Sequence, residues 1–266
     1  MVVHKLNKYS KIGIFDSGLG GLSVLNTVES LLKREGFIYI GDSLNAPYGT
    51  KTKDEVFELS KKICDALIAK DVKAIVIACN TATSAAVSKL RDLYDIPIIG
   101  MEPAIKPALK QTEGQVVVLA TEMTLKESKF VNLVDKLEEG YRIAKLPAPE
   151  WVECVENHMG DEAYVKASVG QFLDAHIPNA QNLVLGCTHF IFLKDEIEKY
   201  YKGKVEIFDG NMGTALQLKN TLESMGLLLD EDIYQENEAN RIEVINTKSD
   251  EYVSKSLNLL SILKRG

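Results

Sequence analysis

Two cysteines carry the clearest chemical signal in the sequence, because each closes a short apolar run and is followed by small polar residues. Cys79 follows Ala74-Ile75-Val76-Ile77-Ala78, and Cys187 follows Asn182-Leu183-Val184-Leu185-Gly186. Neither has a second cysteine at the short spacing of a metal site. Since a thiol can release and take back a proton, two matched thiols at strand ends indicate acid/base chemistry from two sides.

The residues after each cysteine suggest how its proton is controlled. Asn80 and Thr81 follow the first cysteine at the expected start of a helix, and a helix N-terminus favours the thiolate of a group whose ordinary pKa is about 8.5. His189 lies two residues after the second cysteine and can accept or share its proton. Either cysteine alone reads better as a structural buried thiol, but two at equivalent strand ends favour function.

Short apolar runs alternate with longer amphipathic ones, which predicts a parallel α/β fold. Helical periodicity is clear over 22–34, where apolar residues recur at three and four positions. The remaining segments of the first series are predicted as strands over 11–15, 37–41, 74–78 and 96–100, and as a helix over 53–70. The alternation resumes over 115–121, 124–138, 142–146, 162–175, 183–185 and 190–201, and the tail is predicted to hold helices around 213–225 and 252–263.

The length of 266 residues favours two domains, at roughly 150 residues per domain. The alternation breaks near residues 100–103 and again near 208–210, where we expect the chain to cross between the domains. The first α/β domain should span 1–100 and be completed by the C-terminal segment 210–266, and the second should span 101–209. Open parallel sheets bind ligands beyond the carboxyl ends of their strands, and both cysteines fall at that edge.

The composition is that of a folded protein that handles small molecules. Apolar residues make up 45% of the chain and charged residues 26%, so the chain can bury a core. A formal net charge of -7, with scattered lysines, argues against a nucleic-acid partner. The N-terminus lacks a signal-peptide pattern and no run reaches the roughly 18 apolar residues of a membrane helix, so we expect a cytoplasmic protein without a membrane partner.

The other cysteines give no sign of a disulfide framework or a metal site. The four cysteines and four histidines are spread along the chain without paired ligand spacing, so we expect free thiols and no zinc. Cys64 falls on or near the apolar stripe of a predicted helix, and Cys154 falls in a segment that we interpret as irregular. Both are interpreted as structural.

A second group of candidates lies in 13–21, where a predicted strand runs into a glycine-rich turn and a helix. Asp16 ends the strand and Ser17 follows it, while the glycines leave backbone N–H groups open to a substrate carboxylate. The segment lacks the last glycine of a dinucleotide-binding fingerprint, since Ser23 occupies that position, and the chain has no P-loop. A tight turn capped by Asp or Ser is an equally weighted alternative.

The loop over 41–50 is a further candidate, because loops at this edge of a sheet often contact ligands. Pro47 and a neighbouring glycine set its shape, and Tyr48 with the Gly49 amide forms a plausible pair of contacts. A solvated turn without ligand contacts is an equally weighted alternative for this loop.

Taken together, these motifs resemble the cofactor-independent aspartate/glutamate racemase family. The matching pieces occur in family order and span most of the chain through residue 189. They are Phe15-Asp16-Ser17-Gly18-Leu19-Gly20-Gly21-Leu22, Tyr39-Ile40-Gly41-Asp42, Ala46-Pro47-Tyr48-Gly49, Ala78-Cys79-Asn80-Thr81-Ala82, Ala120-Thr121 with Thr124, and Leu185-Gly186-Cys187-Thr188-His189.

The resemblance implies a fold and an activity. The fold is two similar doubly wound parallel-sheet domains with the active site in the cleft between them. The activity is interconversion of L-glutamate and D-glutamate by proton transfer at Cα, which supplies D-glutamate for peptidoglycan synthesis and thus for cell shape. The family uses no cofactor, a point the sequence itself does not settle because it does not exclude a pyridoxal lysine. Glutamate is then the expected partner, and a homodimer is left open.

The resemblance also implies roles for individual residues. Cys79 would take the α-proton of D-glutamate and Cys187 that of L-glutamate. Asp16 would assist the first thiol, while His189, with an acidic residue, would assist the second. Positions that hold the substrate's amino and carboxylate groups match Asp16, Ser17, Pro47, Tyr48, Gly49, Asn80, Thr81, Thr121, Thr124, Thr188 and His189.

The chain departs from the family pattern near the acidic helper, because the usual Cys-Pro pair is missing from 148–156. We align Glu156 as the helper of the second thiol, with Glu153 as its rival. Phe190-Ile191 replaces an expected Tyr-Pro, and Met123 stands where glycine is common. These changes affect the expected pocket shape and leave the thiol pair intact.

Three alternatives remain open. A racemase for aspartate or another amino acid would share the mechanism and differ in pocket dimensions. A binding or regulatory protein could keep the fold without turnover, although a binding pocket alone does not need two strand-end thiols. A thiol redox protein predicts a disulfide between Cys79 and Cys187.

Overall fold

Two separate parallel sheets form the framework of the computed structural model, which describes residues 6–229 and 241–264. The first sheet has the strand order β4-β3-β1-β2-β9 and the second β6-β5-β7-β8, and every pairing is parallel. The strands are β1 (Ile12–Asp16), β2 (Phe37–Gly41), β3 (Ala74–Ile77), β4 (Ile98–Gly100), β5 (Val116–Ala120), β6 (Ile143–Pro147), β7 (Asn182–Leu185), β8 (Glu206–Asp209) and β9 (Ile242–Asn246). The predicted α/β class with two parallel sheets is confirmed.

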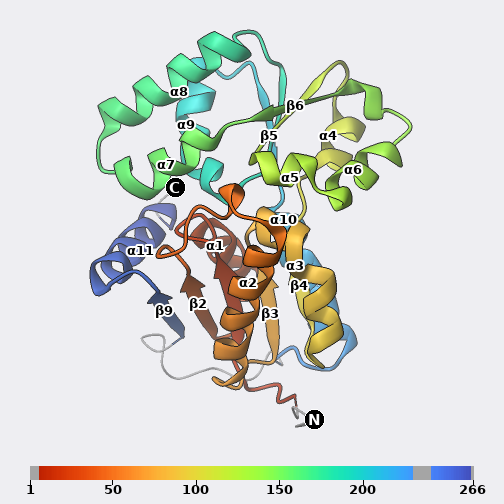
Figure 1. Cartoon of the computed structure of the whole chain (residues 1–266), viewed down its shortest axis with the longest axis vertical. Helices are drawn as coiled ribbons and strands as arrows, with labels where there is room; N and C mark the ends of the chain where they lie inside the picture. The colour runs from red at the N-terminus through yellow and green to blue at the C-terminus, as the bar shows by residue number, and fades with distance from the viewer. Residues whose placement is uncertain (1–5, 230–240, 265–266) are drawn as a thin grey trace.

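Helices cover both sheets (Figure 1). The first sheet lies in the lower part of that view with α1 (Leu22–Leu31), α2 (Lys53–Ile68), α3 (Asn80–Leu93), α10 (Asn211–Ser224) and α11 (Asp250–Leu263). The second lies above it with α4 (Ile105–Gln111), α5 (Glu122–Lys126), α6 (Ser128–Asp135), α7 (Pro149–His158), α8 (Glu162–His176) and α9 (Lys194–Tyr200). Three short 3₁₀ segments are η1 (Tyr48–Thr50), η2 (Gly140–Arg142) and η3 (Thr188–Leu193).

The central strands read as continuous apolar runs because both of their faces are buried. In β3, Ile75 and Ile77 pack into one core cluster with α2 and α3, and Val76 packs into the other with α1 and α10. A strand with one solvent face would alternate apolar and polar residues instead. Packing on both sides therefore explains why β1, β2 and β3 were recognisable from sequence.

The chain passes between the sheets twice. It leaves the first sheet after β4 and enters α4, and it returns from β8 into α10. Helix α10 packs against α1, and β9 pairs with β2, in a register that sets Phe37 opposite Ile242. The tail after β8 therefore rejoins the first sheet.

The parallel registers bring the candidate residues to one edge of each sheet. In the first sheet Phe15 pairs with Ile77, so the chain continues into Asp16 on one strand and toward Cys79 on the next. In the second sheet Leu119 pairs with Leu185, which places Thr121 and Cys187 beyond neighbouring strand ends. Both edges face the region where the two sheets meet.

Three sequence predictions were wrong in detail. No strand was predicted over Ile242–Asn246, yet β9 extends the first sheet there. The segment 124–138, which the alternation gave as one continuous element, is divided into α5 and α6, because Glu127 adopts an extended backbone conformation. Cys154 lies within α7 rather than in an irregular segment, since Pro149 starts that helix at its first turn.

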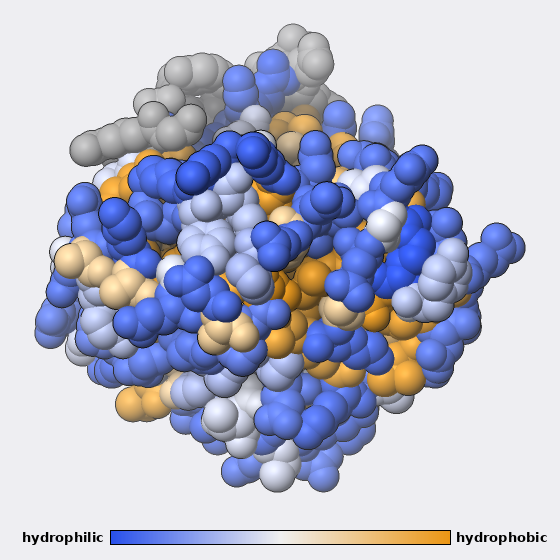
Figure 2. Space-filling model, turned by 90° about the horizontal axis from the view of Figure 1, so that it is seen from above, coloured by the Kyte–Doolittle hydropathy of each residue, from blue (hydrophilic) through white to orange (hydrophobic). Residues whose placement is uncertain are grey.

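The face of the molecule seen from above in Figure 2 is mostly hydrophilic, with apolar patches between the polar side chains. This agrees with the burial of most large apolar residues in four core clusters. Over 6–229 and 241–264, the helices are all too short or too polar to cross a membrane.

Candidate active site

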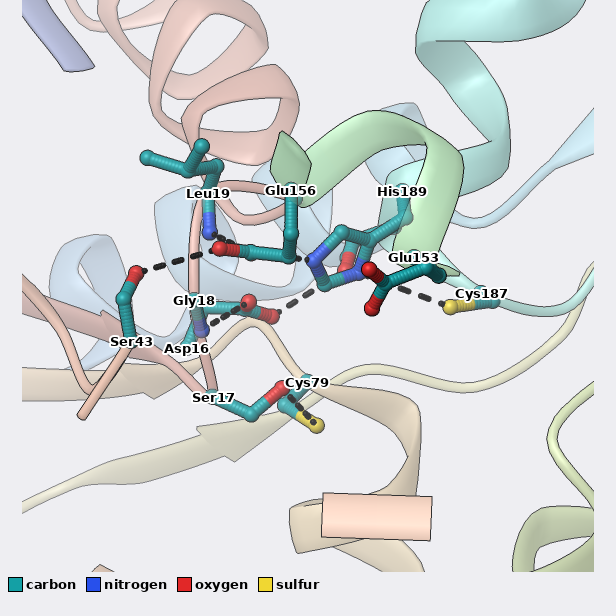
Figure 3. A network of polar contacts seen from close by, with 12 residues as sticks. Asp16, Ser17, Gly18, Leu19, Ser43, Cys79, Glu153, Glu156, Cys187 and His189 are labelled. Carbon is teal, nitrogen blue, oxygen red and sulfur yellow. Dashed lines mark hydrogen bonds and ion pairs between the residues drawn. The ribbon is translucent and has the colours of Figure 1, made fainter. Parts of the chain in front are cut away.

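The thiol of Cys79 lies at the junction between β3 and α3. Cys79 is the N-cap residue of α3, and its Sγ accepts a hydrogen bond from the Ala82 N–H at 3.4 Å. The thiol also donates to Ser17 Oγ at 3.5 Å, and the side chain is only 5% exposed. The strand end thus presents the sulfur to the glycine-rich turn after β1, as Figure 3 shows.

The electrostatic surroundings of Cys79 favour the neutral thiol. Burial raises its pKa to about 12, and the negative charge of Asp16 acts in the same direction. The hydrogen bonds with Ser17 and Ala82 lower the pKa only partly. The N–H group at the helix start lowers the pKa, as expected, but loss of hydration outweighs this effect and the net shift is upward.

Cys187 belongs to a different arrangement. Its Sγ lies 3.7 Å from His189 Nδ1, and His189 Nε2 lies 2.7 Å from Glu156 Oε1. The segment after Cys187 is the 3₁₀ segment η3, and the Cys187 side chain makes no capping hydrogen bond. The expected placement at a strand end is present, but the helix start that accompanies the other thiol is replaced by a histidine and a carboxylate.

The His189 and Glu156 side chains form a buried ion pair. Burial alone would lower the pKa of His189, but hydrogen bonds with Cys187 and Glu156, together with their negative charge, raise it well above its ordinary value. Burial alone would raise the pKa of Glu156, but the hydrogen bond and charge of His189 hold it below its ordinary value. Both shifts therefore favour the charged forms of the two side chains.

The geometry distinguishes the two acidic residues that the sequence left as rivals. Glu156 is 6% exposed and bonds His189 directly. Glu153 is exposed and accepts a hydrogen bond from Asn157 one turn later on α7. The residue that contacts His189 is therefore Glu156.

Groups from the first sheet hold Glu156 from the other side. Oε1 accepts from the Leu19 N–H at 2.6 Å, and Oε2 accepts from Ser43 Oγ at 3.3 Å (Figure 3). A Cβ on Gly18 would lie 2.0 Å from Oε1, so only glycine fits there. Although α7 packs on the second sheet, its carboxylate is bound largely by residues that follow β1 and β2.

Asp16 joins the two halves of the site. Its carboxylate accepts from the Gly18 N–H at 2.9 Å and from Thr188 Oγ1 at 3.1 Å. Burial raises its pKa, against the opposing positive charge of His189. A Cβ on Gly20 would lie 2.5 Å from Thr188 Oγ1 and 2.6 Å from His189 Nδ1. The glycines of this turn therefore permit close approach of the η3 segment.

Asn80 and three threonines bring buried polar groups to the site. The Asn80 amide has no hydrogen-bond partner among the described residues, and the threonine hydroxyls lie close to one another. Asn80 is 3% exposed, and neither of its side-chain polar atoms has a hydrogen-bond partner among the described residues. Thr81 Oγ1 lies 2.9 Å from Thr121 Oγ1 and 3.2 Å from Thr124 Oγ1, and the latter two are 2.9 Å apart. Since buried polar groups are nearly always paired, the unpaired amide of Asn80 points to a ligand.

The loop residues Pro47, Tyr48 and Gly49 contribute less directly. Tyr48 is buried, and its hydroxyl donates to Asp42 Oδ2 at 2.6 Å rather than to the thiol region. Pro47 is exposed. A Cβ on Gly49 would lie 2.9 Å from the Thr121 Cβ, so this glycine allows the loop to pack against the second sheet's side of the site.

Sequence reasoning missed two polar residues that reach this cluster, Ser43 and Asn246. Ser43 lies in the candidate loop over 41–50 but was not predicted as a site residue, and Asn246 ends the unpredicted strand β9. Only the pairing of β9 with β2 brings Asn246 close, so no local signal could have found it. In the described ranges no group of three or more His, Cys, Asp or Glu side chains could hold a metal ion.

Comparisons with known proteins identify the family of the chain. Residues 13–217 match the family model described as Asp/Glu/Hydantoin racemase. A protein from Clostridium perfringens (strain SM101 / Type A) called glutamate racemase is 46% identical over 253 residues, covering 91% of this chain and 96% of that protein.

Solved structures give the same result. A glutamate racemase isoform from Bacillus anthracis aligns with a TM-score of 0.83 at 30% identity, covering 96% of this chain and 95% of that one. An Escherichia coli glutamate racemase, solved in complex with L-glutamate, aligns with a TM-score of 0.80 at 29% identity, covering 94% and 95%. The chain belongs to the Asp/Glu/Hydantoin racemase family.

Proposed function

We propose that the protein is a glutamate racemase that interconverts L-glutamate and D-glutamate through two cysteines. The observation that carries this proposal is the placement of two buried thiols, Cys79 and Cys187, at strand ends of different sheets around one polar cluster. The similar proteins that bear the name glutamate racemase support the choice of substrate. The similar Escherichia coli glutamate racemase was solved with L-glutamate.

In the direction from L-glutamate, Cys187 acts as the base. The imidazolium of His189, 3.7 Å from its sulfur, stabilises the thiolate, and Glu156 holds that imidazolium in place. The thiolate takes the α-proton, and the electron pair of the broken C–H bond stays on Cα. The family resemblance implies which enantiomer each thiol serves, and the histidine beside Cys187 supports its role as a base.

Cys79 acts as the acid in the same direction. Because burial holds its pKa near 12, it carries a proton at neutral pH and can deliver it to the opposite face of Cα. In the reverse direction the roles exchange, so Cys79 must first release its proton to solvent while the Cys187 thiolate takes one up. The ammonium group of a bound substrate would offset the charge of Asp16, which is one cause of that raised pKa. Asp16 thereby assists Cys79 through its charge.

The remaining polar groups would bind the substrate. The unpaired amide of Asn80 and the hydroxyls of Thr81, Thr121 and Thr124 suit a carboxylate and an ammonium group. Ser17, Thr188 and the loop Pro47-Tyr48-Gly49 complete the proposed set. These contacts would fix Cα between the two sulfurs, as a two-base transfer requires.

We propose that the reaction proceeds without pyridoxal phosphate. An α-carbanion without that electron sink needs fixed hydrogen-bond donors and exclusion of water. The buried cluster supplies such a donor in the Asn80 amide, whereas the Gly18 and Leu19 N–H groups of the glycine-rich turn, expected to be open to substrate, already donate to Asp16 and Glu156. Closure of the two domains around glutamate would exclude water.

The proposed biological setting follows from the same activity. The domains would be residues 1–100 with 210–266, and residues 101–209. D-glutamate made in the cytoplasm would enter peptidoglycan synthesis and so support cell shape.

The test is proton NMR of pyridoxal-free protein in deuterated water with L-glutamate, combined with a chiral assay for the D-enantiomer. Loss of the α-proton together with racemisation supports the proposal. Exchange with aspartate but not glutamate would keep the mechanism and replace the substrate. Silence with both amino acids would overturn racemisation in favour of a binding protein.

A further inference from the structure

Two residues of the first sheet form a hydrogen-bond chain that ends on the carboxylate of Glu156. Ser43 Oγ donates to Glu156 Oε2 at 3.3 Å, and Asn246 Nδ2 donates to Ser43 Oγ at 3.0 Å. Ser43 follows β2 and Asn246 ends β9, whereas Glu156 lies on α7 beside the second sheet. Figure 3 shows Ser43 and His189 on different sides of the Glu156 carboxylate.

The direction of this hydrogen-bond chain is fixed by its far end. Asn246 Oδ1 accepts from the Lys248 N–H at 3.0 Å, so its Nδ2 must face Ser43. A serine hydroxyl has one hydrogen, and because Ser43 Oγ already accepts from Asn246, that hydrogen is free to point at Glu156. All three side chains are at most 8% exposed, so water competes little for these bonds.

We propose that Ser43 and Asn246 are positioning residues that orient His189 on the Cys187 side of the site by holding Glu156. With Oε2 held by Ser43 and Oε1 by the Leu19 N–H, the carboxylate keeps one orientation toward His189 Nε2. The other ring nitrogen then stays directed at Cys187. This inference rests on the proposed racemase function.

Two nearby glycines leave room for this hydrogen-bond chain. A Cβ on Gly41 would lie 3.0 Å from Asn246 Nδ2 and 2.7 Å from the Gly18 carbonyl oxygen. A Cβ on Gly18 would overlap the Glu156 carboxylate itself. The glycines in the turn after β1 and at the end of β2 therefore leave space for the hydrogen-bond chain from Asn246 through Ser43 to Glu156.

The sharpest test reverses the direction of this hydrogen-bond chain without changing the size of a side chain. Asn246→Asp replaces the donor with an acceptor, so the Ser43 hydroxyl would turn to the new carboxylate and release Glu156. Ser43→Ala removes the link with the loss of one oxygen atom. Asn182→Asp is the matched control, because Asn182 is also buried and donates to the carbonyls of Glu113 and Gln115, at the opposite end of β7 from Cys187.

The measurements are kcat in both directions and the primary deuterium isotope effects with α-deuterated L- and D-glutamate. We expect both site variants to lower kcat about tenfold, as for the loss of one hydrogen bond to a charged group. Slower transfer at Cys187 should raise the isotope effect from L-glutamate and reduce that from D-glutamate. The Asn182→Asp variant should leave both isotope effects as in the wild type.

Opposite movement of the two isotope effects separates positioning from general destabilisation. If Ser43→Ala and Asn246→Asp keep wild-type isotope effects, or shift both in the same direction, the inference is overturned. Should one variant fail to fold, the other decides the question. A wild-type protein that does not racemise glutamate overturns the proposed function instead, so the two failures are distinguishable.

Discussion

The two thiols occupy equivalent places in their sheets but very different electrostatic surroundings. Cys79 caps an α-helix, contacts a hydroxyl and a backbone N–H, and lies near the negative charge of Asp16. Cys187 precedes a 3₁₀ segment and lies beside the charged pair of His189 and Glu156. Equal placement on strand ends therefore does not imply equal electrostatic surroundings. Burial and the charge of Asp16 favour the protonated form of Cys79, whereas a histidine lies beside Cys187.

The largest expected effect is the loss of either thiol. Cys79→Ala and Cys187→Ala should each lower kcat for racemisation by about 10³-fold or more, since each removes a group that transfers a proton. Turnover of L-glutamate by chiral assay measures this loss, and circular dichroism checks that the fold is kept. Near-normal turnover in either variant would contradict a two-base reaction. The different surroundings of the two thiols would then have no bearing on catalysis.

The next largest effect should come from the carboxylate that distinguishes the Cys187 side. Glu156→Gln should lower kcat about 10²-fold, because a neutral amide no longer stabilises the imidazolium of His189. Glu153→Gln is the matched control on the same helix, and its exposed side chain should allow activity within about twofold of the wild type. Similar losses in both variants would show that α7 as a whole, and not the Glu156 contact, controls the site.

The glycine-rich turn can be tested for its role in joining the two sides. Gly20→Ala would place a Cβ 2.5 Å from Thr188 Oγ1 and 2.7 Å from the His189 backbone nitrogen, so the η3 segment must shift. We expect about a tenfold loss of kcat from displacement of the catalytic groups. Gly213→Ala is the control, because nothing lies within 4 Å of its Cβ position in α10. Equal activity of the two variants would contradict the close-approach argument.

Much of this arrangement was predictable because parallel strands deliver their carboxyl ends to one place. The buried runs that end at Asp16, Cys79 and Cys187 could be recognised without contacts, since both faces of those strands are covered. The strand β9 escaped prediction because it is only partly buried and carries Glu243 within a short run. Its pairing with β2 is a long-range event that no local pattern encodes.

The limits of sequence reasoning were greatest where burial and competition between partners decide the outcome. The helix start at Cys79 was visible, but the desolvation that raises its pKa depends on what packs above it. Tyr48 was a reasonable ligand contact, yet its hydroxyl bonds Asp42, only six residues away. Glu156 could be separated from Glu153 only once α7 was oriented against η3.

The smallest predicted effect concerns stability, and it sharpens the comparison through its dependence on pH. The folded pKa of His189 is raised, so its contribution to the free energy of unfolding is fully present below about 6.5, its unfolded value, and is lost as pH rises through the folded value. The folded pKa of Glu156 is lowered, so its contribution is present above about 4.3 and is lost as pH falls through the folded value.

The wild type should therefore exceed Glu156→Gln in stability by about 2 kcal/mol between these two limits, the size of a hydrogen bond between charged groups. Urea unfolding of both proteins across that window and up to pH 9 measures the difference. The advantage should shrink toward high pH as His189 loses its proton. If the advantage is already absent near pH 7, His189 is neutral in the folded protein at that pH, and the proposed contrast between a thiol beside a cation and a thiol beside an anion loses its basis.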